Sequence, residues 1–440
     1  MQNIFVVGLE PFNQRLLETI APDRYRFLPL FEYAEVEHPP GQEYPSLDDL
    51  VERALDTFAR QEGGADAVIG YWDLPTSLVV PLVARAAGLP GAPLEAVAKC
   101  EHKYWSRLEQ AEALGDMVPR FQAIDPFADD PSADLEIDYP FWLKPIKAHS
   151  SFLGFYIDGP ETLRSHLPQI REQIWIMARP MNEFMAHVDA PDEIRAVNGY
   201  HCIAEEIVSQ GFQCTLEGFG YGDEIEIFGV VDSIRSGKHH SCFARYQYPS
   251  KLPGSVQARM AEAAKRFMRH IGYRGAAFNI EFFWNSDDDS IHVLEINSRI
   301  SKSHSPLFLF VDGATNQKVV VELALGRRPQ LPHRAGDHAL AAKFMLRYFE
   351  NGIVERAPRP RDIERVQHAH PEALVRVFAR DGMRLSELAL QDSYSYEVAE
   401  IFLGADRQKA LLDEYLHVCE ILDFRVRPLS EAGGPESAQR

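Results

Sequence analysis

The stretch VLEINSRIS, residues 293–301, alternates apolar residues with charged and amide residues. Side chains two positions apart in a strand point to the same face, so the alternation predicts a strand that carries Glu295, Asn297 and Arg299 side by side. The aliphatic residues of the same stretch are expected to pack in a core. A carboxylate, an amide and a guanidinium held in one row against a core indicate a functional face of the molecule.

A second strand is predicted over 275–284, joined to the first by the acidic turn NSDDDS. If the two strands pair symmetrically about this turn, Glu281 lies opposite Glu295 and Asn279 opposite Asn297, with Cβ atoms about 4.5–5.5 Å apart. Two facing carboxylates repel unless something positive lies between them, and Mg²⁺ commonly bridges carboxylates to substrate phosphates. The alternative is a solvated acidic face, which the apolar neighbours of both glutamates disfavour.

A lysine and the loop after it form another candidate site. The segment FWLKPI (141–146) places Lys144 in an otherwise apolar strand, and KAHSSFLG (147–154) follows it as a short flexible loop with two serines and a glycine. Exposed backbone amides of such a loop can hold phosphate oxygens while a lysine supplies positive charge. A lysine that only extends its charged end to solvent is the alternative. The sequence has no GxxxxGK[ST] pattern, so this is not a P-loop.

Composition restricts the classes of function. The chain has 440 residues, enough for two or three domains, and a formal net charge of −20. This acidity disfavours nucleic acid or an anionic membrane as the main partner, since phosphate-rich surfaces need a basic protein face. Five cysteines without a CxxC pair argue against a disulfide framework or a zinc knuckle. With no evident secretory signal and no apolar run of membrane-spanning length, we expect a cytoplasmic protein.

Strand and helix patterns divide the chain into units. Alternating strands and helices over 1–98 predict a small parallel α/β domain. The segment GYWDLP (70–75) would lie at the ligand-facing edge of its sheet, and a packed aromatic loop is an equal alternative. A strand is expected near 174–180. A smaller α+β unit is predicted over 331–428, and 429–440 is predicted to be a disordered tail.

The order of these segments resembles the ATP-grasp superfamily, in particular its carboxylate–amine (amino-acid) ligases, with the domain order of biotin carboxylase. The resemblance covers roughly 1–330 and rests on CEHKYWSR, WLKPIKAHSSFLG, AEEIV and the pair IEFFW…VLEINSR, of which the last is the most specific. It implies an α/β plus α+β fold with a small N-terminal parallel α/β (pre-ATP-grasp) domain, a two-lobed ATP-grasp domain over 99–330 and a small C-terminal α+β domain.

The resemblance also implies a site for ATP and Mg²⁺, with Mn²⁺ as a substitute. Glu281 and Glu295 would hold the metal ion, Asn297 a second ion, and Arg299 would face the transferred group. The implied nucleotide-binding residues are Lys103, Lys144, Ser150, Ser151, Gly154, Glu205, Glu206, Ile207, Val208 and Gln213. There are two departures from the family pattern: the phosphate loop has only one glycine, and a glutamine stands where a ribose-binding acid is common.

Further candidates lie outside these motifs. His304, in the loop after Arg299, is a candidate base for an incoming amine, and a structural loop histidine is the equal alternative. Arg245 is a candidate contact for a substrate carboxylate or the γ-phosphate, against a surface ion pair. Together with Arg299 and Lys144, these residues form the predicted catalytic set.

The expected activity is that of an ATP-dependent carboxylate–amine ligase. It would activate a carboxylate, in the first instance that of an amino acid, as an acyl-phosphate, and condense it with an amine, releasing ADP and phosphate. The alternatives are a biotin carboxylase-like reaction with bicarbonate and a non-catalytic ATP-binding regulator. Small-molecule acids and amines are the expected partners, and a homodimer is expected from the family alone.

Overall fold

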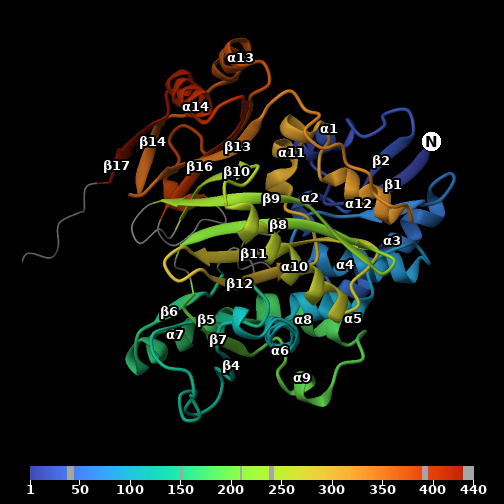
Figure 1. Ribbon diagram of the computed structural model, residues 1–440, viewed down its shortest axis with the longest axis vertical. Coiled ribbons are helices and arrows are strands. Elements are labelled where there is room, and N and C mark those ends of the chain that lie inside the picture. The colour runs from blue at the N-terminus through green and yellow to red at the C-terminus, as the bar shows by residue number, and fades with distance from the viewer. Residues whose placement is uncertain (37–43, 149–151, 209–210, 237–241, 389–394, 430–440) are drawn as a thin grey trace, which may run out of the picture.

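The computed structural model describes residues 1–36, 44–148, 152–208, 211–236, 242–388 and 395–429. Their strands form a three-stranded, a four-stranded, an eight-stranded and a two-stranded sheet. In Figure 1 the large sheet lies at the centre, the N-terminal sheet to its right and the four-stranded sheet below it. No described helix is both long enough and apolar enough to cross a membrane.

The N-terminal sheet is parallel, as the strand–helix alternation predicts. Its strand order is β2-β1-β3. Its elements are β1 (Gln2–Val7), α1 (Pro11–Leu17), β2 (Tyr25–Leu30), α2 (Tyr33–Val36), α3 (Leu47–Arg60), β3 (Ala67–Ile69) and α4 (Thr76–Ala86). Alternate residues of β1 enter two different cores, because side chains along a strand point to opposite faces. The sheet is therefore covered on both faces, as is usual for parallel sheets.

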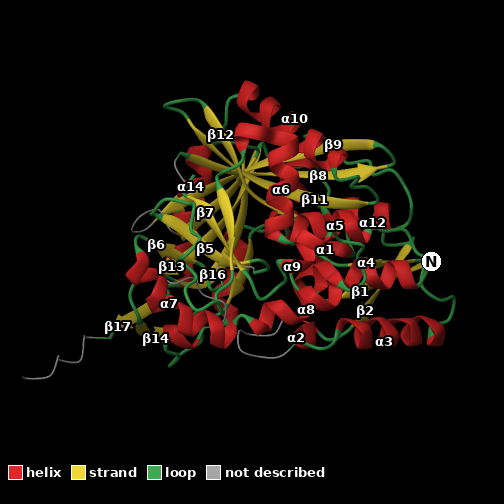
Figure 2. Ribbon diagram, turned by 90° about the horizontal axis from the view of Figure 1, so that it is seen from below, coloured by secondary structure: helices red, strands yellow, loops and turns green. Residues whose placement is uncertain are grey.

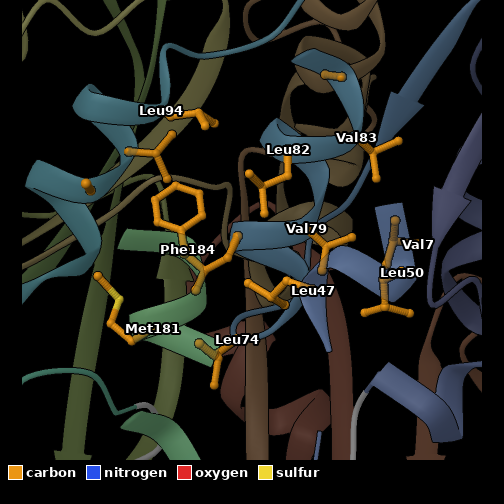
Figure 3. Close-up of a cluster of buried hydrophobic side chains, with 14 of the residues drawn as sticks. Val7, Leu47, Leu50, Leu74, Val79, Leu82, Val83, Leu94, Met181 and Phe184 are labelled. Atoms are coloured by element: carbon orange, nitrogen blue, oxygen red, sulfur yellow. The ribbon is translucent and has the colours of Figure 1, made fainter. Parts of the chain in front are cut away.

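One of these cores receives a helix from far along the chain. Met181 and Phe184 of α8 (Trp175–Met185) pack with Leu82 of α4 and Leu50 of α3 (Figure 3). The strand expected near 174–180 is wrong: this segment begins α8. Its bulky apolar residues favour a strand locally, but its buried positions recur at a helical spacing that faces the N-terminal core.

The four-stranded sheet forms a separate small lobe. Its order is β4-β7-β5-β6, and every pair is antiparallel. Its elements are β4 (Phe121–Ile124), β5 (Phe141–Pro145), β6 (Phe155–Ile157), α7 (Pro160–Gln173), β7 (Cys202–Glu206) and the short α9 (Asp192–Ala196). Leu163, Leu167 and Ile170 of α7 pack against one face of this sheet. The face of this sheet that α7 does not cover carries Lys144 of β5, which lies near Glu295 of the large sheet.

The eight-stranded sheet carries the hairpin that contains Glu281 and Glu295. Its order is β12-β11-β8-β9-β10-β13-β16-β15. The strands are β8 (Phe212–Tyr221), β9 (Glu224–Ser236), β10 (Cys242–Tyr248), β11 (Ala276–Asn285), β12 (Ser290–Asn297), β13 (Leu340–Tyr348), β15 (Leu374–Val377) and β16 (Tyr396–Ala405). Helix α10 (Gly254–His270) covers one face of this sheet (Figure 2). Its Met260 and Phe267 pack there with apolar residues of β8, β11 and β12. The charged residues of β11 and β12 lie on the opposite face.

The C-terminal segment extends this sheet. The strands β13, β16 and β15 add to the edge of β10, so the predicted α+β unit over 331–428 shares its main sheet with the preceding unit. Helices α13 (Pro360–Ala369) and α14 (Gln408–Leu422) cover this end, while β14 (Gly352–Arg356) and β17 (Arg425–Pro428) form the two-stranded sheet. Pairing with β13 satisfies the backbone groups of β10, which would otherwise be an open edge. All but the first residue of the predicted disordered tail (429–440) lies outside the described residues.

Candidate functional site

The acidic hairpin has the predicted register at its functional end. Glu281 pairs with Glu295 and Asn279 with Asn297. Beyond Glu281 the register shifts by one residue, so that a β-bulge at Leu294 interrupts the symmetry toward the turn. The two carboxylates therefore lie on adjacent strands of the uncovered face, as predicted from the sequence.

The surroundings of this pair leave Glu281 short of positive charge. Burial, together with the nearby carboxylate of Glu295, raises the pKa of Glu281 to about 7. The amide of Gln213 donates to Glu281 Oε2 at 2.7 Å, and Gln213 Oε1 is buried without a hydrogen-bond partner among the described residues. Gln213, predicted near the ribose, thus lies against the carboxylate pair. A cation at this position would remove the repulsion that raises the pKa.

Lys103 reaches the pair because a predicted helix is interrupted. The helical segment over 99–115 forms α5 (Leu94–Glu101) and α6 (Lys103–Leu114), which meet at His102. His102 Nδ1 accepts from the N–H of Trp105, so the histidine caps α6. Lys103 Nζ then lies 2.5 Å from Glu295 Oε1 and donates to the Ala148 carbonyl at 3.1 Å.

A buried ion-pair group connects the two lobes. Lys144 Nζ of β5 lies 2.6 Å from Glu205 Oε2 of β7, and Arg107 Nε of α6 donates to Glu205 Oε1 at 2.8 Å. Arg107 also donates to the carbonyl of Leu294 at 2.7 Å, the residue of the bulge. Burial opposes ionisation of Glu205, but Arg107 and Lys144 outweigh it and lower its pKa to about 2. The same lysine and Lys103 lower the pKa of Glu295 against its burial.

The predicted hinge joins the two lobes. Ile207 and Val208 follow β7 of the small sheet, and β8 of the large sheet begins shortly after them. Glu206 is half-buried, and its backbone N–H donates to the carbonyl of Arg120 at 2.9 Å. Gly154 lies directly before β6, whereas Ser150 and Ser151 of the predicted phosphate loop lie outside the described residues.

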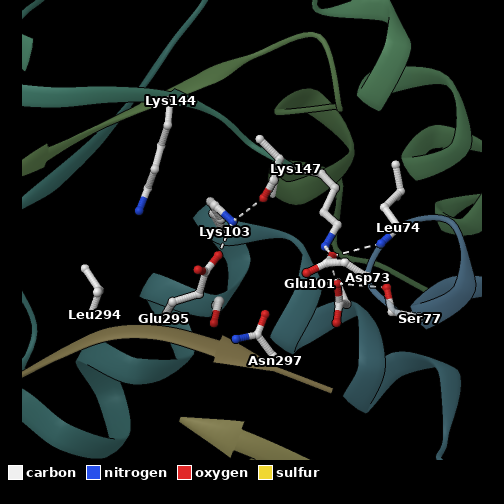
Figure 4. A network of polar contacts seen from close by, with 12 residues as sticks. Asp73, Leu74, Ser77, Glu101, Lys103, Lys144, Lys147, Leu294, Glu295 and Asn297 are labelled. Atoms are coloured by element: carbon white, nitrogen blue, oxygen red, sulfur yellow. Dashed lines mark hydrogen bonds and ion pairs between the residues drawn. The ribbon is translucent and has the colours of Figure 1, made fainter. Parts of the chain in front are cut away.

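Arg299 lies against the N-terminal sheet. Its Nη2 donates to Asp73 Oδ2 at 2.5 Å and to Asn297 Oδ1 at 3.3 Å. Asp73 Oδ1 accepts from Lys147 Nζ at 2.8 Å, and Glu101 Oε2 lies 2.5 Å from the same nitrogen. Figure 4 shows this acidic pair around Lys147, beside the contact between Lys103 and Glu295.

The two remaining candidates contact residues other than the carboxylate pair. His304 is buried, with Nδ1 2.8 Å from Glu217 Oε1, which favours the structural alternative for this residue. Arg245 pairs with Ile234 across β9 and β10 and lies on the face opposite to Glu281. Arg235 of β9 lies on the same face as Glu281 and, like Arg299, contributes positive charge to its surroundings.

Five charged residues of this region are absent from the sequence prediction of the site. They are Asp73, Glu101, Arg107, Lys147 and Arg235. Three of them fall inside the quoted segments CEHKYWSR and WLKPIKAHSSFLG, and Asp73 falls inside GYWDLP. Their charge, next to apolar residues in these segments, was the feature of the sequence that could have identified them as site residues. Their partners lie far away in sequence, so their pairing could not be read from spacing.

Part of this chain matches known protein sequences. A family model for the ATP-binding domain of the carbamoyl-phosphate synthase L chain matches residues 248–330, which include β11, β12 and Arg299. A carbamoyl phosphate synthase large chain from Halomonas eurihalina is 24% identical over 127 residues, or 29% of this chain and 11% of that protein. The match therefore spans about a tenth of the length of that curated relative.

Many solved structures match this chain, and several of them match nearly its whole length. An L-amino acid ligase from Bacillus licheniformis has a TM-score of 0.72 at 16% identity, covering 98% of this chain and 99% of its own. The biotin carboxylase domain of 2-oxoglutarate carboxylase from Hydrogenobacter thermophilus, in complex with MgADP, ADP and bicarbonate, has a TM-score of 0.63 at 15% identity, covering 97% and 91%. The chain therefore has the ATP-grasp fold, and the resemblance to the ATP-grasp superfamily is confirmed.

Proposed function

We propose that this protein is an ATP-dependent ligase that activates a carboxylate as an acyl-phosphate and condenses it with an amine, releasing ADP and phosphate. The observation that carries the proposal is the convergence of charge on one face of the large sheet. Glu281 and Glu295 face each other there. Lys103 of α6 contacts Glu295, Lys144 of β5 adds positive charge near Glu295, and Arg299 follows β12. Opposed carboxylates surrounded by cations are suited to nucleotide phosphates and a bridging metal ion.

The residues present fit a divalent metal ion. Glu281 and Glu295 would hold Mg²⁺, or Mn²⁺ in its place, and Asn297 would add an amide oxygen. Burial and the carboxylate of Glu295 raise the pKa of Glu281, and a cation between the two carboxylates would relieve their repulsion. When bound, Mg²⁺ supplies charge neutralisation for the phosphates of ATP.

In the first step, an oxygen of the substrate carboxylate attacks the γ-phosphorus of ATP. The bond from this phosphorus to the bridging oxygen breaks, and ADP leaves with the electron pair. Two anions must approach each other for this attack, so cationic side chains must hold and screen them. Lys103, Lys144 and Arg299 supply that charge, and the ion pairs of Lys144 with Glu205 and of Arg299 with Asp73 hold these two side chains in place.

In the second step, the amine nitrogen attacks the acyl carbon. A C–N bond forms, the bond from the acyl carbon to the phosphate oxygen breaks, and phosphate leaves with the electron pair while the nitrogen loses a proton. His304 is buried against Glu217, so its role in this proposal is to hold the loop after Arg299. The N–H of Ser301 donates to the same Glu217 carboxylate at 3.0 Å, which holds that loop from a second point.

An amino acid on the acid side, the amine side or both is the substrate class that we propose. Similarity to the L-amino acid ligase over the full length of both chains supports it. Carboxylation with bicarbonate is the second candidate, and it is supported by the match to the biotin carboxylase domain. A regulator that binds ATP without turnover would have no use for both acidic side chains of the hairpin.

A pairwise screen of amino acids tests the proposal. Purified protein with ATP and Mg²⁺ is mixed with pairs of amino acids, and ADP, phosphate and the condensed product are measured by coupled assay and mass spectrometry. ADP release that requires both amino acids and matches the amount of condensed product supports the ligase. Release of AMP and pyrophosphate contradicts the acyl-phosphate mechanism, and ADP release that requires bicarbonate and biotin favours the carboxylase.

A further inference from the structure

The N-terminal sheet contributes a carboxylate that holds Arg299. Asp73 follows β3, at the edge where the carboxyl ends of the parallel strands lie. Its Oδ2 accepts from Arg299 Nη2 at 2.5 Å, and its Oδ1 accepts from Lys147 Nζ and from the N–H of Leu74, each at 2.8 Å. Both carboxylate oxygens are therefore occupied, and one side chain links the segment after β12 to the segment after β5.

A second acid completes this group. Glu101, at the end of α5, is buried and lies 2.5 Å from Lys147 Nζ. Its other oxygen accepts from the N–H and the hydroxyl of Ser298 at 3.1 and 2.5 Å, directly before Arg299. Two carboxylates thus face two cations. Glu101 holds the backbone directly before Arg299, and Asp73 holds the guanidinium of Arg299.

The residues next to Asp73 and close to Arg299 also join these two segments, through a cation–π contact. Lys302 Nζ lies 4.1 Å from the centroid of the Trp72 ring, a cation–π distance. Trp72 is buried, and its indole N–H donates to the carbonyl of Gly8 at 2.9 Å within the N-terminal sheet. Trp72 and Asp73 therefore contact Lys302 and Arg299 respectively, so that the edge after β3 is joined to the loop after β12 at two successive points.

We propose that Asp73 is a positioning residue for Arg299, by which the N-terminal domain sets the direction of the guanidinium in the reaction. This inference rests on the role that the proposed function gives to Arg299. The same Nη2 atom that contacts Asp73 also donates to Asn297, so the carboxylate and the amide define the angle of the guanidinium between them. A long side chain without such a partner samples several rotamers. Small misplacements of a charged group at a reacting centre lower the reaction rate strongly.

Two variants and one control test the proposal. Asp73→Ala removes the acceptor, and Asp73→Asn keeps the shape and one acceptor oxygen but removes the charge. The control is Asp66→Ala, which alters the aspartate at the other end of β3, where Asp66 accepts from the N–H of Asn3 at 2.7 Å. Crystal structures of all three variants are compared with the wild-type protein. We expect Arg299 to leave Asn297 in Asp73→Ala and to remain in Asp66→Ala.

Kinetics supply the second readout. For Asp73→Ala we expect kcat to fall about 10- to 100-fold, with the KM for ATP within about threefold of the wild type, and a smaller loss for Asp73→Asn. In an Arg299→Lys background, Asp73→Ala should lower kcat by less than about threefold, because the side chain that it positions is already changed. Asp66→Ala should leave kcat unchanged.

Three results would overturn the inference. They are an unmoved Arg299 in Asp73→Ala, an equal loss of kcat in both Arg299 backgrounds, and a loss in Asp66→Ala as large as that in Asp73→Ala. If Asp73→Ala does not fold, Asp73→Asn carries the same comparisons. The crystal structures decide the positioning role even if the wild-type protein condenses no pair of amino acids, in which case only the proposed function fails.

Discussion

Two pairs of acidic side chains lie close together in this molecule, and their surroundings differ. Asp73 and Glu101 each contact Lys147, and Asp73 also contacts Arg299. Glu281 and Glu295 face each other across β11 and β12, where Lys103 forms an ion pair with Glu295 and the neutral amide of Gln213 donates to Glu281. Among the described residues, two cations form ion pairs with the first pair of carboxylates, whereas one cation forms an ion pair with the second.

This difference in charge balance distinguishes a structural pair of carboxylates, Asp73 and Glu101, from a pair suited to bind a ligand, Glu281 and Glu295. A buried ion pair adds little net stability to a protein, but removing one partner is strongly destabilising because the other charge stays buried and uncompensated. A carboxylate that faces another carboxylate instead has a raised pKa, as burial and Glu295 give Glu281, and a positive ligand would stabilise it. The balanced pair therefore holds the segments together, and the unbalanced pair is the place where we expect the metal ion.

The largest expected effect breaks the balanced pair. Glu101→Gln should lower the free energy of unfolding by about 3–5 kcal/mol, since it leaves Lys147 buried with less compensation. Glu281→Gln, measured by the same urea denaturation at pH 8, should be unchanged or more stable, because it removes a carboxylate whose ionisation the fold disfavours. Equal destabilisation by the two substitutions would contradict the distinction between the pairs.

Turnover should respond in the opposite way. Glu295→Gln is expected to lower kcat roughly 100- to 1000-fold, the cost of removing one preorganised charged or polar group from a reacting centre. Circular dichroism should show an intact fold. Asp287→Asn, in the exposed turn of the same hairpin, is the matched control and should retain normal turnover. Near-normal activity of Glu295→Gln would remove the proposed metal role.

Metal binding should stabilise the protein only while the unbalanced pair is intact. With a non-hydrolysable ATP analogue present, Mg²⁺ at about 100 times its dissociation constant should add about 2.7 kcal/mol of stability. The gain is measured as a rise in the thermal midpoint that EDTA reverses. In Glu281→Gln the rise should shrink, whereas it should persist in Asp287→Asn. A rise of the same size in both variants would place the ion elsewhere.

The smallest effect concerns His102, the residue between Glu101 and Lys103. Burial lowers the pKa of His102 to about 4 from its ordinary value near 6.5, despite a hydrogen bond to the Val197 carbonyl. Because the folded pKa is the lower one, the stability from keeping this ring neutral is complete above pH 6.5. It is lost as the pH falls toward 4, by roughly 1 kcal/mol between pH 7.5 and 5.5.

This pH dependence can be isolated by substitution. His102→Asn keeps a side chain that can cap α6 but removes the titrating group. The difference in unfolding free energy between pH 7.5 and 5.5 should therefore be smaller in the variant than in the wild-type protein. An identical pH dependence in both proteins would mean that His102 is not held neutral by the fold.

The sequence predicted the hairpin because its determinants are local. Alternation places side chains on one face of a strand, and a short turn sets which residues meet, so Glu281 and Glu295 could be paired from numbering alone. The bulge at Leu294 was not predicted, because its arginine partner lies in a distant helix. Helix α8 was predicted as a strand for a related reason: its apolar residues are buried by the N-terminal domain, which the local sequence does not contain.

By itself, the sequence determined which strand pair carries the carboxylates, the parallel N-terminal sheet and the family resemblance, since these depend on periodicity and short-range pairing. Only the tertiary structure decided which charges are balanced. It brought Asp73 to Arg299 and Lys144 to Glu205, and it kept Arg245 away from the carboxylates. Electrostatic energy depends on distance and burial rather than on separation along the chain, and both arise only when the lobes pack together.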